Sequence, residues 1–182
     1  WFVADTSKKI RAVFKAKAQN GRHSNSVAPY GYKPSAEDKF IWDIDEPAAE
    51  VVRDIYKMCV SGMGPQYIAK ELESRGLKIP QIYKAERDGV PPKHIPKRPD
   101  TMWHTSVVVN ILSNREYTGT AVLNRKTSKS YKDHRKFVKP EEEWIIHENA
   151  HPAIIDTETW ETVQRIRSNR RQVTRTYEKG AL

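Results

Sequence analysis

The apolar residues near the middle of the chain recur at the spacing of an amphipathic helix. Val108, Ile111 and Leu112 fall at positions i, i+3 and i+4, and Thr105 is well suited to cap the first turn. The opposite face of this predicted helix gathers small residues, namely Ser106, Val109, Asn110 and Ser113. A helix that packs through its apolar stripe therefore presents small polar side chains, which can approach a ligand closely.

A strand is predicted directly after this helix. Asn114 and Arg115 end the helical pattern, and the run from Thr120 to Leu123 has the composition of a strand. A recognition helix followed by a wing has this order of elements. An ordinary surface helix with a solvated polar side has the same pattern, so the stretch Trp103–Gly119 alone leaves both interpretations open.

A short strand and a helix are predicted earlier in the chain. Phe40–Ile44 has strand composition, and Asp45 or Glu46, with Pro47 in the first turn, begins a helix. Its apolar stripe consists of Ala48, Val51, Val52, Ile55 and Cys59. The helix stops at the glycine-rich turn Ser61–Gly64.

Pro65 opens the next predicted helix, which Gly76 closes as a left-handed cap. The residues that face inward from it are Ile68, Ala69 and Leu72. Together with the helix at Thr105, these elements supply the three helices of a helix-turn-helix unit. We therefore expect an α+β fold, mainly helical, with a helix-turn-helix or winged-helix-like core and a small antiparallel β element.

A basic helix and linker are predicted before this core. Residues 4–20 have an apolar stripe of Ile10, Val13, Phe14 and Ala18, with Lys8, Arg11 and Lys15 on the opposite side. Gly21–Ser26 is a flexible basic linker, and Pro29–Tyr32 is a rigid turn with two aromatic residues. A basic helix face is often only solvated, but its continuation into this linker indicates a strap that can lie in a DNA groove.

Two basic segments are predicted as loops. Ile79–Asp100 contains five prolines among its lysines and arginines, so it cannot be regular throughout. A polyproline ligand is one interpretation, and a loop that contacts phosphates is the simpler one. Lys126–Lys139 is predicted as the basic tip of a long hairpin in which Trp144–Ile146 pairs with a strand that begins after Gly119 and continues to Arg125.

Asp156 caps the last predicted helix, which has Trp160, Val163 and Ile166 inward and passes into a run of arginines. The domain boundaries that we expect are 1–22 for the end of a long linker helix, 23–39 for the strap, 40–171 for the DNA-binding domain and 172–182 for a tail.

The charge of the chain points to a polyanion as the partner. The 182 residues carry a formal charge of +9, and the cations cluster near the N-terminus while Pro140–Trp160 holds only acidic charges. A single cysteine, Cys59, excludes an internal disulfide and a multi-thiolate zinc site. No run has transmembrane length and no signal peptide opens the chain, so we expect a cytoplasmic protein without a membrane partner. The start at Trp1 suggests a piece of a longer protein.

The segment His147–His151 matches the HExxH pattern of zinc metalloproteases. Pro152 disfavours a helical conformation at His151, and the residues before the motif look like a strand, so the two imidazoles are not expected to converge. We therefore expect no metal, no other cofactor and no catalytic site in this chain.

Five stretches in one order resemble the recombinase domain of large serine recombinases, over nearly the whole chain. The stretches are Gly21 with Pro29–Tyr32; Glu46–Tyr56; Ile68–Leu72 with Arg75–Gly76; Trp103, Val108, Ile111–Asn114, Tyr117 and Gly119; and His151–Asp156. In that family a separate N-terminal domain carries the serine that attacks DNA, and a long helix joins it to the recombinase domain. A zinc ribbon and a coiled coil usually follow.

The resemblance implies a chain that binds double-stranded DNA without cutting it. The serine domain and the zinc ribbon have no counterpart in these residues, so the implied partners are DNA, the protein's own catalytic domain and other recombinase protomers. The expected role is recognition of attachment-site or transposon-end DNA. A winged-helix transcriptional regulator is the main alternative, and a nuclease or protease built on the histidines is a second.

The candidate DNA-binding residues fall into a phosphate set and a base-reading set. The first set consists of basic residues near the N-terminus, together with candidates from the strap and the hairpin. Its members are Lys8, Lys9, Arg11, Lys15, Lys17, Arg22, His23, Tyr30, Tyr32 and Lys126. The base-reading set is His104, Thr105, Ser106, Asn110 and Arg115. Asn110 is suited to an adenine edge and Arg115 to a guanine or a phosphate. Each of them can also be an ordinary exposed residue, and tyrosines in such turns more often pack than contact bases.

Overall fold

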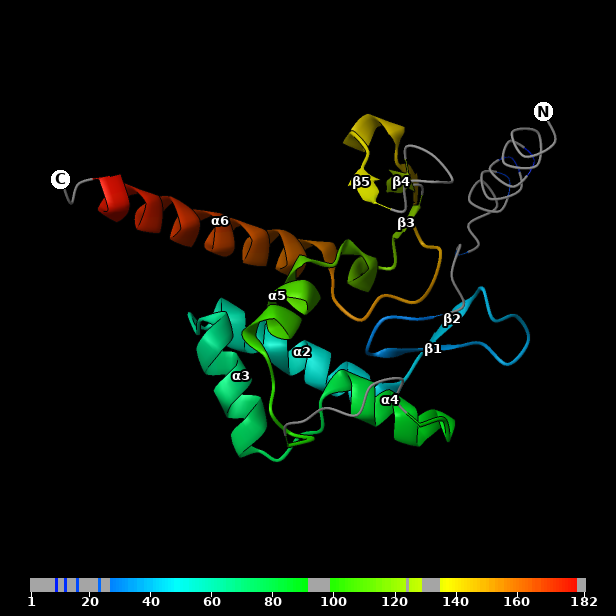
Figure 1. Ribbon diagram of the computed structural model, residues 1–182, viewed down its shortest axis with the longest axis horizontal. Coiled ribbons are helices and arrows are strands. Elements are labelled where there is room, and N and C mark those ends of the chain that lie inside the picture. The colour runs from blue at the N-terminus through cyan, green and yellow to red at the C-terminus, as the bar shows by residue number, and fades with distance from the viewer. Residues whose placement is uncertain are drawn as a thin grey trace. The chain divides into compact units, whose positions relative to one another are not determined.

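The chain forms two compact units in the computed structural model (Figure 1). The residues that the structure describes are 27–91, 99–123, 125–128 and 135–179, together with Lys9, Ala12, Ala16 and His23. Trp1–Asp45 and Arg115–Ile154 make up one unit, which we call the sheet unit. Glu46–Asn114 and Ile155–Leu182 make up the other, the helical unit.

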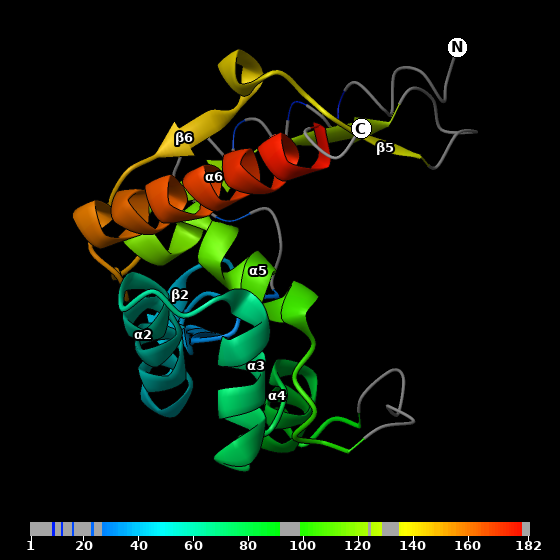
Figure 2. The ribbon, with the colours of Figure 1, turned by 90° about the vertical axis from the view of Figure 1, so that its left-hand side faces the viewer.

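The helical unit contains five helices in its described part. They are α2 (Glu46–Val60), α3 (Pro65–Ser74), α4 (Pro80–Asp88), α5 (Thr105–Ser113) and α6 (Thr157–Lys179). Helix α2 packs against α3, α5 and α6, and α5 lies between α3 and α6 in both views of the ribbon (Figures 1 and 2). Helices α2 and α5 are therefore the central pair, and α3 and α6 both pack against them, as a helical core requires.

The core of the helical unit is built from the stripes that the sequence predicts. Val52, Ile55, Leu72, Val108, Leu112 and Val163 are fully buried. Gly62 and Gly76 have φ values of +100° and +68°, a region that side-chain-bearing residues rarely adopt, so these glycines end α2 and α3. At the start of α6 the Asp156 carboxylate accepts a 2.7 Å hydrogen bond from the backbone N–H of Thr159, as an N-cap does.

The sheet unit contains three antiparallel strand pairs in its described part. Strand β1 (Tyr32–Pro34) pairs with β2 (Trp42–Ile44), β3 (Ala121–Leu123) with β6 (Ile145–His147), and β4 (Lys126–Ser128) with β5 (Lys136–Val138). The 3-10 helices η1 (Arg115–Thr118) and η2 (Glu141–Glu143) complete it. Together with the helical unit this confirms the predicted α+β class.

Several predicted boundaries were wrong. Pro80–Asp88 forms α4, because a proline in the first turn starts a helix and Gly89, with a φ of +64°, ends it. The expected hairpin tip contains β4 and β5, and the strand after Gly119 ends at Leu123 instead of Arg125. Helix α6 continues to Lys179, beyond the predicted end at Arg171. Most of the predicted helix 4–20 lies outside the described residues, where only Lys9, Ala12 and Ala16 are described, as helical.

No helix in the described ranges is both long enough and apolar enough to cross a lipid bilayer.

Candidate nucleic-acid interface

Helix α5 presents an uncharged polar face. Thr105, Ser106, Asn110 and Ser113 are exposed, whereas Val108, Ile111 and Leu112 are buried. Among the α-helices that the structure describes, α5 alone has no Asp, Glu, Lys or Arg; α2, α3, α4 and α6 all carry carboxylates. A face of small side chains without carboxylates can approach a polyanion closely and without repulsion.

The end of α5 is held by two side chains from other helices. The last carbonyl groups of a helix lack partners within the helix. The hydroxyl of Tyr56 in α2 donates to the carbonyl oxygen of Ile111 at 3.0 Å, and the side-chain amide of Gln164 in α6 donates to that of Leu112 at 2.7 Å. These two hydrogen bonds satisfy carbonyls that would otherwise need water, and they fix the helix to its neighbours.

The start of α5 is fixed by the two residues that precede it, Trp103 and His104. The indole N–H of buried Trp103 donates to the carbonyl oxygen of Leu77, just after α3, at 2.8 Å. The cap residue is His104, one position before the predicted Thr105, and its side chain makes no capping hydrogen bond. The backbone carbonyl of His104 accepts from the N–H of Val107 at 2.9 Å and so opens the helix. With both ends held, the polar face of α5 is preorganised.

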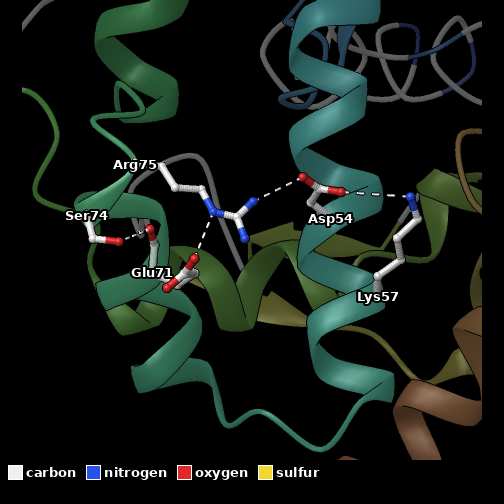
Figure 3. Close-up of polar contacts among 5 residues, drawn as sticks. All are labelled: Asp54, Lys57, Glu71, Ser74 and Arg75. Carbon is white, nitrogen blue, oxygen red and sulfur yellow. Dashed lines mark hydrogen bonds and ion pairs between the residues drawn. The ribbon is translucent and has the colours of Figure 1, made fainter.

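A mixed-charge network covers part of the surface of α2 and α3 (Figure 3). The guanidinium of Arg75 donates to the Glu71 carboxylate at 2.9 Å and to the Asp54 carboxylate at 3.3 Å. Lys57 lies 3.8 Å from Asp54, and the Ser74 hydroxyl donates to the Glu71 carbonyl at 2.8 Å. Arg75 and Lys57 already face carboxylates, so these two cations are less available to bind phosphates.

The sheet unit buries three of the candidate DNA-binding residues. His23, Tyr30 and Tyr32 are 2%, 6% and 0% exposed, so their side chains are not available to a DNA groove. The hydroxyl of Tyr32 donates to the carbonyl oxygen of Pro152 at 2.8 Å, and the hydroxyl of Tyr117 donates to that of Tyr30 at 2.8 Å. The interpretation of this segment as a groove-binding strap is therefore wrong for these three residues, because contacts with residues far along the chain bury their side chains.

His23 and His151 form a buried, neutral pair within that core. His151 Nε2 lies 2.7 Å from the Glu116 carbonyl oxygen, so Nε2 must carry the proton, and Nδ1 accepts from His23 Nε2 at 3.1 Å. Burial, followed by the repulsion that a protonated His151 would exert, lowers the pKa of His23 from 6.5 to about 3. Burial also lowers the pKa of His151, although the hydrogen bond to Glu116 opposes this shift.

The structure describes only some of the other predicted DNA-binding residues. Lys9 is helical and exposed, and Lys8, Arg11, Lys15, Lys17 and Arg22 lie outside the described residues. Arg115 is exposed at the start of η1, in the sheet unit. Lys126 belongs to β4, where its register partner is Val138.

The HExxH match does not lie on a helix. His147 ends β6, Glu148 and Asn149 form a turn with a φ of +54° at Asn149, and His151 is buried beside His23. The expectation that this segment is not helical is therefore confirmed, since the chain turns at Glu148 and Asn149. Within the described ranges no three His, Cys, Asp or Glu side chains are grouped to hold a metal ion.

Sequence reasoning missed the residues that hold α5. Tyr56 lies on the buried stripe of α2, where a hydroxyl is a weak signal for a hydrogen bond to a neighbouring backbone. Gln164 carries no signal at all, because a glutamine next to an apolar position on a long polar helix is usually solvated.

Residues 46–170, more than half of the chain, match the recombinase family. The chain belongs to the recombinase family. The matched region begins with α2 and ends within α6, so it contains all of α5 and its neighbours.

Two solved structures share the fold of this recombinase-family chain. One is described as the crystal structure of an LSR–DNA complex, with a TM-score of 0.54 and 19% identity over 88% of this chain and 38% of the other. The second concerns the sequence requirements of the Listeria innocua prophage attP site, with a TM-score of 0.54 and 19% identity over 90% of this chain and 50% of the other. The chain thus spans half or less of each of these two structures. These findings confirm the resemblance to large serine recombinases.

Proposed function

We propose that this chain binds double-stranded DNA sequence-specifically, at an attachment site or transposon end, for a site-specific large serine recombinase. The observation that carries the proposal is the exposed, uncharged polar face of α5, held at both ends within a recombinase-family domain. The similar structures are described as an LSR–DNA complex and as a study of an attP site, which supports DNA as the ligand.

In this proposal α5 enters the major groove. Asn110 reads an adenine edge through its amide, and Thr105 and Ser106 reach base edges from the first turn, with His104 beside them. The major groove is wide enough for a helix with small side chains. A good bidentate contact to a base favours that base over a wrong one by about 1–3 kcal/mol. The buried stripe of α5 keeps the face pointing outward.

Phosphate contacts supply the rest of the affinity. The proposed set is Lys8, Lys9, Arg11, Lys15, Lys17, Arg22, Arg115 and Lys126. Because such contacts release counterions, they make binding depend on salt and carry little sequence information. His23, Tyr30 and Tyr32 are not retained in the set, since their side chains are buried.

The proposed division of labour assigns DNA cleavage to a serine domain outside these residues. The chain therefore acts on DNA as a binding module, with the catalytic domain and other protomers as its protein partners and the cytoplasm as its location. The family match disfavours an independent winged-helix transcriptional regulator.

The test begins with duplexes that the purified chain enriches from a random-sequence library. Binding to an enriched duplex and to its scrambled version is measured over a range of salt concentrations. Asn110→Ala is expected to abolish the preference while leaving the salt slope unchanged, since base reading and phosphate contact are separate. Asn169→Ala, which removes an exposed asparagine from α6, is the matched control. Equal binding of all duplexes by the unmodified chain would overturn sequence specificity, and no binding at low salt would overturn DNA binding.

A further inference from the structure

The turn between α2 and α3, Ser61–Gly64, is held by a side chain from α6. The guanidinium of Arg170 donates hydrogen bonds to the carbonyl oxygens of Gly62 and Met63, to the latter at 3.2 Å. Two of the four turn residues are glycines, and Gly62 has a φ of +100°, so the turn has little conformational preference of its own. Arg170, more than a hundred positions later in the same helical unit, therefore fixes the path of the chain between the two helices.

Arg170 is the last of three α6 residues that we call the α6 row, Gln164, Arg167 and Arg170. They are spaced three positions apart, which places each next to the following one on the helix surface. The Arg167 guanidinium donates to the side-chain oxygen of Gln164 at 3.0 Å, so the amide nitrogen of Gln164 faces the Leu112 carbonyl, to which it donates. The α6 row thus holds the end of α5 through its first member and the α2–α3 turn through its last.

Helix α3 connects the turn to the polar face of α5. It begins directly after the turn, and it packs against α5. Ile68 and Leu72 of α3 are fully buried, as are Val108 and Leu112 of α5. Because a close-packed core leaves little room for independent movement, a change in the path of the turn moves α3 and, through it, α5.

We infer that Arg170 is a positioning residue for the polar face of α5, which it orients through the α2–α3 turn and the packing of α3. The inference rests on the proposed function, in which that face reads bases in the major groove. Arg170 directs its donors to two protein carbonyls and not to a DNA phosphate. Arg165 is a suitable comparison, because its guanidinium donates within α6, to the Thr162 hydroxyl at 3.0 Å on the exposed surface.

The test compares Arg170→Gln with Arg165→Gln, which removes the same charge from the same helix. The affinity for an enriched duplex is divided by the affinity for its scrambled version, over a range of salt concentrations. A variant that is only less stable loses the same fraction of active protein for both duplexes, so its ratio does not change. We expect Arg170→Gln to lower the ratio roughly threefold or more with an unchanged salt slope, because a misplaced helix loses part of its base discrimination. Arg170→Lys, which keeps a charged donor at this position, is expected to recover part of the ratio.

Two outcomes of this comparison would overturn the inference. An unchanged ratio in Arg170→Gln, with sequence-specific binding intact, would show that the polar face of α5 does not depend on Arg170. An unchanged ratio with a salt slope smaller by about 0.9 would make Arg170 a phosphate contact instead.

A DNA-free measurement separates the inference from the proposed function. Cys59 is the single cysteine of the chain and is fully buried three positions before Gly62, so the rate at which a thiol reagent labels it reports opening near the turn. Arg170→Gln is expected to raise this rate several-fold relative to Arg165→Gln. Burial raises the pKa of the Cys59 thiol and the charge of Arg170 opposes that shift, so removal of the charge alone would slow the labelling.

Urea denaturation of both variants gives the labelling expected from global unfolding alone. An acceleration in Arg170→Gln beyond that expectation locates the opening at the turn, and it supports the hold of Arg170 on the turn even if no duplex binds. Equal labelling rates in the two variants, or an acceleration that global unfolding accounts for fully, would refute the inference.

Discussion

The side-chain amide of Gln164 donates a 2.7 Å hydrogen bond to the carbonyl oxygen of Leu112, which ties α6 to the end of α5. The same amide lies 3.4 Å from the carbonyl oxygen of Trp160, one turn earlier in its own helix. A residue in the last helix of the chain thus fixes the orientation of the helix that presents the proposed base-reading face.

Replacing Gln164 is expected to destabilise the helical unit. Gln164→Leu leaves the Leu112 carbonyl without its side-chain donor, and an unmet hydrogen bond at a part-buried carbonyl costs about 1–2 kcal/mol. Urea denaturation followed by circular dichroism measures the free energy of unfolding. Ser168→Ala, at an exposed position of the same helix, controls for the helix propensity of α6. An unchanged free energy in Gln164→Leu would mean that water replaces the amide fully.

Acid is expected to destabilise the sheet unit through the histidine pair. His23 and His151 have lowered pKa values, so the folded state holds them neutral while the unfolded chain protonates them near their ordinary pKa. Their contribution to the free energy of unfolding is complete above pH 6.5. It decreases as the pH falls toward the pKa of His23 in the folded state, about 3. The loss is at most about 1.4 kcal/mol per pH unit for each group.

Denaturation between pH 7 and pH 5 measures this effect before most carboxylates titrate. His23→Phe removes one of the two groups and retains an aromatic ring to stack on Trp42, as the His23 ring does, so its stability is expected to depend less steeply on pH. The same slope in both proteins would exclude His23 as a source of the acid sensitivity.

Gly119 is expected to tolerate no side chain. Its φ is +79°, and a Cβ atom there would lie 2.8 Å from the backbone carbonyl oxygen of His151. Gly76→Ala is the matched comparison, because Gly76 has a φ of +68° and no atom within 4 Å of the added Cβ. The left-handed conformation alone costs about 1–2 kcal/mol in an alanine variant. Thermal unfolding is expected to show a larger loss for Gly119→Ala, and equal losses would contradict the steric argument.

The mixed-charge network of α2 and α3 is expected to matter little for stability or binding. Asp54→Asn removes the carboxylate that Arg75 and Lys57 share, but the Lys57 side chain is largely exposed and those of Asp54 and Arg75 are nearly half exposed. Exposed ion pairs contribute about 0–1 kcal/mol and are screened by salt. Calorimetry is expected to show a small change in stability that vanishes at high salt. A large loss of DNA affinity in this variant would move the proposed interface from α5 toward α2 and α3.

The helices of the helical unit could be predicted because their signals are local. Pro47 and Pro65 mark first turns, Gly62 and Gly76 mark ends, and the apolar spacing of Val52 and its neighbours marks the buried face. Helix α4 was missed because a segment with many prolines is usually irregular. Pro80, however, lies in the first turn, where a helix tolerates proline. The polar face of α5 followed from periodicity alone, but its DNA contacts stay a proposal.

The sequence by itself determined the helical stripes and the uncharged face of α5, because each depends on residues within a few turns of one another. It also determined the recombinase-family resemblance, because that depends on the order of five stretches along the chain. Only the tertiary structure decided what happens to His23, Tyr30 and Tyr32. Their burial depends on partners such as His151 and Pro152, more than a hundred positions away from His23 and Tyr32. An aromatic or histidine in a basic segment has the same local pattern whether it faces a duplex or a core, and only the tertiary contacts with the distant partners distinguish the two.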